Sequence, residues 1–363
     1  MWYEKWDFIE DPYGIKRTKS IPSDRITWNR DDLSDKENIH RFLDAVFDHR
    51  SVSLRVFGPT RSGKTWLLVY LEKMLREKLG DNIVIINSEV PEAEPTIDSF
   101  YRRFIESLNT QIPSFLEKVE EKVGNNQQGW RDYFDDYELG SALYHIRFKG
   151  DQKIVSEQWL SGARLSASSL RPAGLITSLT KYKEVQIIVK LIDRIGSLYE
   201  SCVLMVDEIG QIRPPSAARI IGGTLREILD SSYEKFGLVC TYTAVLSDYL
   251  MDLGYSQHFY KRFDYEVELA AIAEDYVDDF LTIHHSVYRK PDSSIENQLI
   301  PFMEGSLNKM LELMSFENYY PGPILHSCGV MASKAARENV AEISPSFVEE
   351  SKDRLPKSYL RQP

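Results

Sequence analysis

The chain has 363 residues, of which 42% are hydrophobic and 27% are charged, a composition typical of a globular protein of about two domains. Its formal net charge of −11 excludes a surface covered with positive charge, so a nucleic-acid contact would need a local basic patch. We find no secretory signal and no apolar run long enough to cross a bilayer, which predicts a cytoplasmic protein. The three cysteines lack metal-ligand spacing and are predicted to be reduced core thiols.

Residues 57–65, FGPTRSGKT, follow an apolar run typical of a buried parallel strand and precede an amphipathic helix expected over residues 65–80. The two glycines, the lysine and the threonine have the spacing of a phosphate-binding P-loop. Glycines let backbone N–H groups approach phosphate oxygens, while Lys64 supplies positive charge and the Thr65 hydroxyl can ligate Mg²⁺. A glycine turn that only resembles a P-loop is the alternative.

We therefore predict that this segment binds ATP. The predicted nucleotide-binding residues are Gly58, Pro59, Thr60, Arg61, Ser62, Gly63, Lys64, Thr65 and Trp66. Lys64 is expected to be an exposed ligand group, so that its replacement by alanine would leave the fold intact.

Residues 201–210, SCVLMVDEIG, predict a short buried strand that ends in two carboxylates. At the carboxyl end of such a strand, Asp207 would join the Mg²⁺ shell and Glu208 would act as the general base for water. A solvated acidic turn is the alternative. The second carboxylate favours hydrolysis over phosphoryl transfer, which disfavours a small-molecule kinase.

A helix is expected over residues 216–229 and a strand over residues 236–244, with Thr241 and Thr243 near the carboxyl end of that strand. Either threonine could touch the γ-phosphate or orient water, or be an ordinary strand residue. Arg262 precedes a short strand at Tyr265–Leu269 and is predicted to be a catalytic arginine finger in trans, or a surface cation. The alternation of strands and helices predicts a three-layer α/β fold with a mostly parallel sheet.

The P-loop, the Asp-Glu strand end, the polar-ended strand and the KRF segment together resemble the AAA+ ATPases. The resemblance is closest to the branch that contains origin-licensing ATPases, TnsC/TniB-type transposition regulators and Orc-like ATPases of bacterial defence loci such as BREX. It implies that Gly58 to Thr65 bind phosphate, that Asp207 and Glu208 serve Mg²⁺ and water, that Thr241 or Thr243 is sensor 1, and that Arg262 is the finger. Residues 11–32 resemble a lead-in that such proteins wrap over the adenine.

Two departures from the AAA+ pattern stand out. The segment NYYPGPILHSC, residues 318–328, offers no sensor-2 arginine, so hydrolysis is expected to be slow or dependent on a partner. The separation of Lys64 and Asp207 exceeds that of a compact AAA+ core, which predicts a largely helical insertion around residues 113–185. Basic residues there predict a contact with double-stranded DNA, although a solvated helix face is the alternative; they are Arg164, Arg171, Lys181 and Lys183, with Lys190 next to them.

The sequence thus predicts a lead-in at residues 1–50, an AAA+ α/β domain at 51–270, an α-helical lid at 271–345 and a polar tail at 346–363 that is loose or held by a partner. Within the lid, helical segments are expected over residues 271–288, 294–316 and 322–339. The predicted function is an ATP-governed assembly switch that forms homo-oligomers with ATP between subunits. The setting would be a DNA-linked mobile element or anti-phage defence, with a protein effector as partner. The alternative is a STAND-like adaptor that holds a nucleotide and docks a partner with little turnover.

Overall fold

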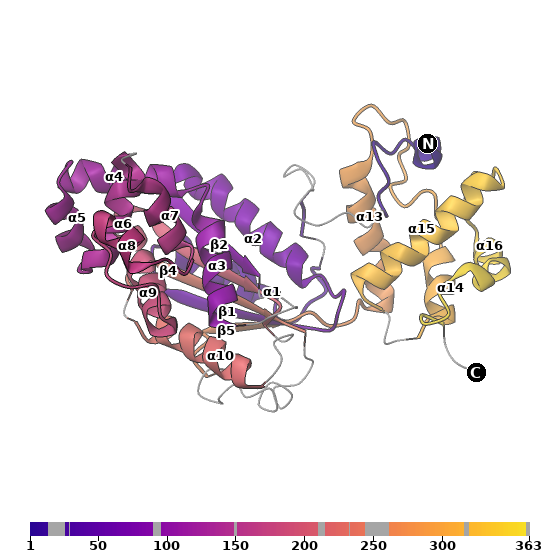
Figure 1. Ribbon diagram of the computed structural model, residues 1–363. Coiled ribbons are helices and arrows are strands. Elements are labelled where there is room, and N and C mark those ends of the chain that lie inside the picture. The colour runs from indigo at the N-terminus through magenta and orange to yellow at the C-terminus, as the bar shows by residue number, and fades with distance from the viewer. Residues whose placement is uncertain are drawn as a thin grey trace. The chain divides into compact units, whose positions relative to one another are not determined.

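The computed structural model describes residues 1–13, 26–28, 30–89, 96–148, 151–209, 215–231, 233–243, 261–315 and 319–360. Figure 1 shows its helices and strands. The chain divides into two compact units. We call Asn38–Phe57 with Met74–Val267 the sheet unit, and Met1–Glu37 with Gly58–Lys73 and Glu268–Pro363 the helical unit.

The sheet has five strands in the order β2-β3-β4-β1-β5. The pairs β2–β3, β3–β4 and β1–β4 are parallel, so the carboxyl ends of these four strands lie at one edge. In this register Phe57 is level with Tyr242, and Val206 is level with Cys240. The strands are β1 (Val52–Phe57), β2 (Ile83–Glu89), β3 (Ser201–Asp207), β4 (Phe236–Tyr242) and β5 (Tyr265–Glu268).

The two faces of the sheet are covered by different helices, because side chains alternate along each strand. Leu204 and Leu238 belong to the core shared with α3 and α9. A Cβ on Gly237, the next position on β4, would lie 3.4 Å from Val46 of α1, which places α1 on the opposite face. This three-layer arrangement confirms the predicted fold class. The helices are α1 (Lys36–Phe47), α3 (Ile97–Leu108), α9 (Lys181–Leu198) and α10 (Pro215–Asp230).

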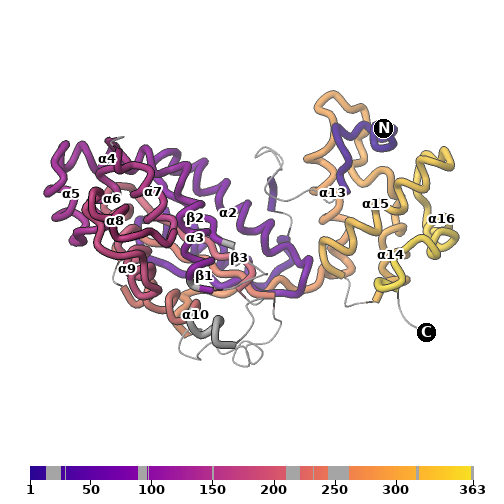
Figure 2. The backbone as a smooth tube through the Cα atoms, viewed as in Figure 1, coloured from indigo at the N-terminus to yellow at the C-terminus, as the bar shows by residue number. Residues whose placement is uncertain are grey.

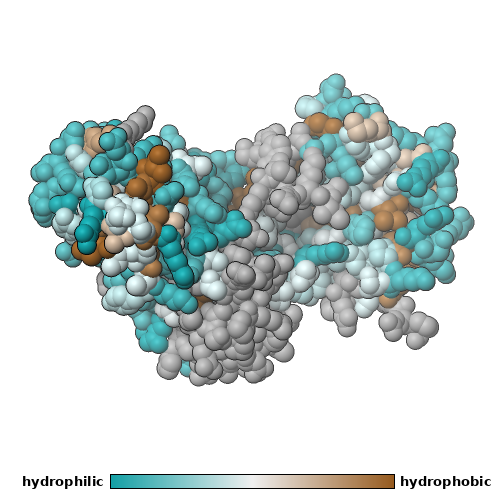
Figure 3. Space-filling view, in the orientation of Figure 1, coloured by the Kyte–Doolittle hydropathy of each residue, from teal (hydrophilic) through white to brown (hydrophobic). Residues whose placement is uncertain are grey.

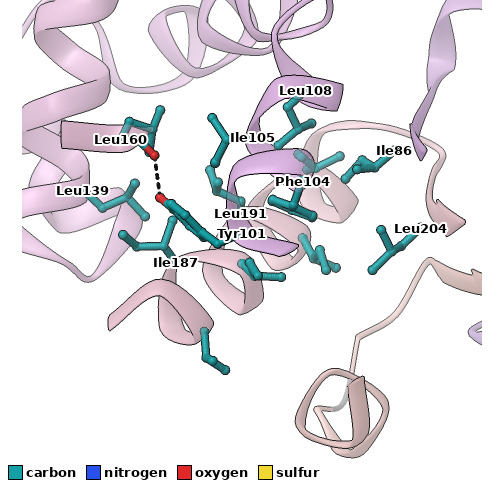
Figure 4. Packing of buried hydrophobic residues seen from close by; sticks show 14 of the residues in the cluster. Ile86, Tyr101, Phe104, Ile105, Leu108, Leu139, Leu160, Ile187, Leu191 and Leu204 are labelled. Atoms are coloured by element: carbon teal, nitrogen blue, oxygen red, sulfur yellow. Dashed lines mark hydrogen bonds between the residues drawn. The ribbon is translucent and has the colours of Figure 1, made fainter. Parts of the chain in front are cut away.

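The stretch between α3 and α9, where an insertion is predicted around residues 113–185, consists largely of helices. Its aromatic side chains join the core of the sheet unit, and the Tyr101 hydroxyl donates to the Leu160 carbonyl at 2.7 Å (Figure 4). The helices are α4 (Ile112–Val123), α5 (Gln127–Phe134), α6 (Tyr137–Phe148), α7 (Lys153–Leu160) and α8 (Ala167–Leu170), followed by the 3₁₀ turn η5 (Arg171–Ala173).

The helical unit has its own core, to which both ends of the chain contribute. The Trp6 indole donates to the Ala341 carbonyl at 2.7 Å, and the Ile9 amide donates to the Tyr288 carbonyl at 2.8 Å. Figure 2 shows the N-terminal residues beside α13 and α15. The elements are η1 (Trp2–Trp6), η7 (Glu274–Tyr276), α13 (Val277–Tyr288), α14 (Ser306–Leu313), α15 (Pro321–Arg337), α16 (Pro345–Glu350) and η9 (Lys352–Arg354).

Several expectations for this region are corrected. Leu355 and Tyr359 are buried, so the tail up to residue 360 is held by the chain itself rather than loose. Of the helix expected at residues 294–316, the described residues form α14 only at Ser306–Leu313. The three cysteines, by contrast, are free and buried as predicted.

Among the described residues, no helix is long and apolar enough to cross a membrane.

Candidate nucleotide-binding site

The P-loop directly follows β1, and α2 (Lys64–Leu79) begins at its lysine. Its two glycines are required by geometry. A Cβ on Gly58 would lie 2.7 Å from the Ser62 hydroxyl and 3.0 Å from the Leu269 carbonyl. Gly63 has φ +101°, a conformation that disfavours any side chain. The loop therefore keeps backbone close to backbone, as phosphate binding through N–H groups demands.

Lys64 is buried, with 6% of its surface exposed, which corrects the expectation of an exposed side chain. Its ammonium donates to the carbonyls of Gly58 at 3.0 Å and Pro59 at 2.7 Å. A buried ammonium needs such acceptors because its transfer from water is otherwise costly. Replacement of Lys64 is consequently expected to affect the loop's stability as well as its ligand.

Other polar atoms of this region fit a nucleotide. The Ser62 hydroxyl and the Trp28 indole N–H are buried and have no hydrogen-bond partner among the described residues. Buried polar groups are nearly always paired, so these two atoms are available to a ligand. The Trp66 indole donates to the Thr27 carbonyl at 2.7 Å, which places the end of the predicted lead-in along α2. Most of that lead-in, residues 14–25, lies outside the described residues.

The acidic end of β3 is a hydrogen-bonded cluster within the sheet unit. The Thr241 hydroxyl donates to Asp207 Oδ1, and the Glu208 amide lies 2.9 Å from Thr241 Oγ1 and 3.0 Å from Asp207 Oδ1. Glu208 has φ +60°, an uncommon conformation for a residue with a side chain. The structure thus brings Asp207, Glu208 and Thr241 together at the carboxyl edge of the sheet. Thr243 lies beyond β4, which ends at Tyr242.

Arg262 lies near the amino end of β1, away from the carboxyl ends of the parallel strands. Its carbonyl accepts from Ser53 Oγ at 3.2 Å, and Ser53 is the second residue of β1. From there the strand rises about 13 Å to Phe57, where the P-loop begins. The guanidinium is 47% exposed and lies 2.6 Å from Asp230 at the end of α10. The helix expected to hold Arg262 falls at residues 244–260, outside the described part of the chain.

The basic residues predicted to contact DNA are not equivalent. Lys183 Nζ lies 2.6 Å from Asp136 Oδ2, and Lys190 Nζ lies 3.6 Å from the same oxygen. Arg164, Arg171 and Lys181 are exposed and form no ion pair with described residues. Exposed apolar side chains lie near them in sequence: Ile154 precedes Arg164, and Ile176 and Tyr182 follow Arg171. Figure 3 shows hydrophobic residues on the surface of this helical part. Only three of the four predicted contacts thus remain free to bind phosphate.

Sequence reasoning missed two contacts of the P-loop within the helical unit. The Gly322 amide donates to the Arg61 carbonyl at 3.1 Å, and the Arg61 guanidinium donates to the Tyr359 hydroxyl. The Pro-Gly-Pro start of α15 was a signal for close backbone approach, whereas nothing in the sequence pairs Tyr359 with residue 61. For metals, no group of three or more histidine, cysteine or acidic side chains that could hold an ion occurs among the described residues.

No family model matches the chain, and no curated protein sequence matches it. Solved structures resemble it in fold. The Aeropyrum pernix ORC2 protein in its ADPNP–ADP complexes has a TM-score of 0.54 at 10% identity, with 98% of this chain and 74% of that chain covered. Cdc6p from Pyrobaculum aerophilum has a TM-score of 0.52 at 12% identity, covering 96% and 72%. Drosophila ORC bound to DNA has a TM-score of 0.50 at 10% identity, covering 94% and 63%. The fold of this chain is therefore that of the Orc and Cdc6 structures, an α/β layer followed by a helical region.

Proposed function

We propose that the chain is an Orc-like AAA+ ATPase, which binds ATP on the P-loop and hydrolyses it with Glu208 as general base. The observation that supports this most directly is the hydrogen-bonded cluster of Asp207, Glu208 and Thr241. It stands at the edge of the sheet from which β1 leads into a P-loop. In open parallel sheets, ligands bind beyond the carboxyl ends of the strands.

Each side chain has a defined task in this proposal. Lys64 exchanges its loop carbonyls for phosphate oxygens, and the backbone amides of the loop bind the remaining charge. The Thr65 hydroxyl and the Asp207 carboxylate are oxygen ligands of the kind that Mg²⁺ prefers, and the ion would neutralise charge on the phosphates. Glu208 accepts a proton from the attacking water, and Thr241 holds the backbone of Glu208 in place.

We further propose that ATP governs assembly of this chain into oligomers in a DNA-linked setting. The placement of Arg262 supports a role in trans, because it lies beside Ser53 at the start of β1, about 13 Å along the strand from Phe57. Of the proteins with this fold, Drosophila ORC is a DNA-bound complex. Arg164, Arg171 and Lys181 are the cations available for DNA. We also propose, from the resemblance of the sequence, a mobile-element or anti-phage setting with a protein effector as partner.

The decisive experiment is a steady-state ATPase assay of the purified chain with and without double-stranded DNA. We expect hydrolysis that depends on Mg²⁺ and rises with DNA, and its loss in Lys64→Ala. Turnover near zero under every condition, with nucleotide still bound, would instead support the STAND-like adaptor. That alternative is favoured by one observation: the N-terminus of α15 meets the P-loop with prolines and a glycine and no arginine.

The oligomeric part of the proposal is tested by mixing variants. Arg262→Ala should bind ATP normally but lose hydrolysis and ATP-induced assembly together, because an arginine finger contributes about 10³ or more to turnover. Mixing it with Lys64→Ala should recover part of the activity, since each protein supplies what the other lacks. An Arg262→Ala protein of full activity would leave Arg262 a surface cation paired with Asp230.

A further inference from the structure

Arg61 stands at the tip of the P-loop in a conformation that a side chain disfavours. Its φ is +68°, a left-handed conformation that is unfavourable for a residue with a side chain. Residues are held in this way where surrounding contacts over-determine them, often at ligand sites. The contacts that hold Arg61 therefore set the shape of the loop.

Two elements of the helical unit supply those contacts. The Gly322 amide at the start of α15 donates to the Arg61 carbonyl, and a Cβ on Gly322 would lie 2.7 Å from the Arg61 Cβ. The Arg61 guanidinium donates to the Tyr359 hydroxyl, which also lies 3.4 Å from His326 Nδ1 of α15. The backbone and the side chain of one strained residue are thus bound separately.

Tyr359 is itself firmly placed. It is 7% exposed, its carbonyl accepts from the Ser315 amide at 2.7 Å, and its amide donates to the Pro356 carbonyl at 2.8 Å. The next residue, Leu360, forms a β-bridge with Met314. Residues 356–360 therefore form a fixed strap, and the phenol of Tyr359 is its acceptor for Arg61.

We propose that Tyr359 is a positioning residue of the nucleotide site, which holds Arg61 and thereby presets the P-loop for phosphate. This inference rests on the proposed nucleotide binding. Without the phenol oxygen, Arg61 relaxes toward a negative φ and the loop must be ordered again when phosphate binds.

The test is a double-mutant cycle on nucleotide affinity, measured with a fluorescent ATP analogue on the full chain. Tyr359→Phe should raise the Kd about three- to tenfold, the range expected for the net contribution of one typical hydrogen bond. In an Arg61→Gly background the same change should have no effect, since glycine adopts the conformation without strain and has no guanidinium to hold. Lys357→Ala, an exposed neighbour on the strap, is the matched control and should leave the Kd unchanged.

A second readout does not depend on nucleotide. Amide hydrogen exchange over residues 58–64 should be faster in Tyr359→Phe than in the parent chain, at equal melting temperature. Equal Kd values for Tyr359→Phe and the parent, or the same loss in both backgrounds, would overturn the positioning role. If the parent chain itself binds no ATP analogue while exchange still responds to Tyr359→Phe, the proposed function fails and the strap contact stands.

Discussion

The P-loop and the acidic end of β3 both end a strand of one parallel sheet, but they are built by opposite means. The P-loop depends on its backbone: Gly58 and Gly63 allow close approach, and Lys64 is satisfied by loop carbonyls. The acidic end depends on side chains, because the Thr241 hydroxyl links Asp207 to the backbone of Glu208. The difference predicts that the first region decides whether nucleotide binds and the second decides whether it is cleaved.

The largest effect is expected for Lys64→Ala, which should abolish ATP binding in a calorimetric titration. It should also lower the melting temperature, because the carbonyls of Gly58 and Pro59 lose a charged donor worth about 1.5–3 kcal/mol. Lys64→Arg, which keeps the charge, is the matched control and should retain more of the stability. Unchanged ATP affinity in the alanine variant would show that the P-loop does not decide whether nucleotide binds.

Glu208→Gln is expected to separate nucleotide binding, which the P-loop decides, from hydrolysis, which the acidic end of β3 decides. ATP affinity should be retained, while turnover falls by about 10²–10⁴, since a carboxamide cannot accept the proton of the attacking water. Single-turnover hydrolysis measures the chemical step directly. Glu234→Gln, an exposed glutamate of the same unit, controls for the loss of charge. Normal hydrolysis by the Glu208 variant would show that another group is the base.

Thr241→Val should reduce turnover about 10- to 100-fold, because the isosteric side chain cannot bond Asp207 or the Glu208 amide. Thr241→Ser restores the hydroxyl and should recover most of the rate. The same substitution at Thr243, which lies past β4, should cost less, and that ranking decides which threonine is the sensor. A larger loss at Thr243 would reverse the assignment.

The smallest expected effect is on the melting temperature and concerns a second buried carboxyl group, Glu184. Its hydrogen bonding differs from that of Asp207. Asp207 has the Thr241 hydroxyl as donor, whereas Glu184, 4% exposed in α9, has an oxygen without a partner among the described residues. Burial first, and then the charge of Asp98, raise the pKa of Glu184 from its ordinary 4.5 to about 7. The folded state thus binds this proton more tightly than the unfolded state does.

The stability from that proton is complete below pH 4.5 and is lost as the pH rises to about 7. Glu184→Gln, which is neutral throughout, should therefore raise the melting temperature relative to the parent at pH 8 and change it little at pH 5. Glu234→Gln is the exposed control. A difference between variant and parent that does not change with pH would mean that Glu184 is not protonated in the fold.

The sequence by itself determined the features that depend on local geometry. The glycine spacing of residues 58–65 predicted the P-loop, and apolar runs predicted β1, β3, β4 and β5 with the helices between them. The Asp-Glu pair at the end of β3 and Thr241 on β4 were also accessible, because parallel strands bring their carboxyl ends to one edge. The hydrophobic repeat of helices and strands and the residue preferences of turns act over a few residues, so they can be read from a single sequence.

Only the tertiary structure decided which charges remain free and what touches the loop. Lys183 counted as a free cation in its own segment, yet Asp136, 47 residues earlier, neutralises it. Lys64 is buried by its own loop, and Arg61 is held by Tyr359, 298 residues away in sequence. Contacts of this kind form when segments distant in sequence pack together. A hydrogen bond between two side chains requires no repeating pattern in the residues around either one, so the sequence gives no periodic signal for it.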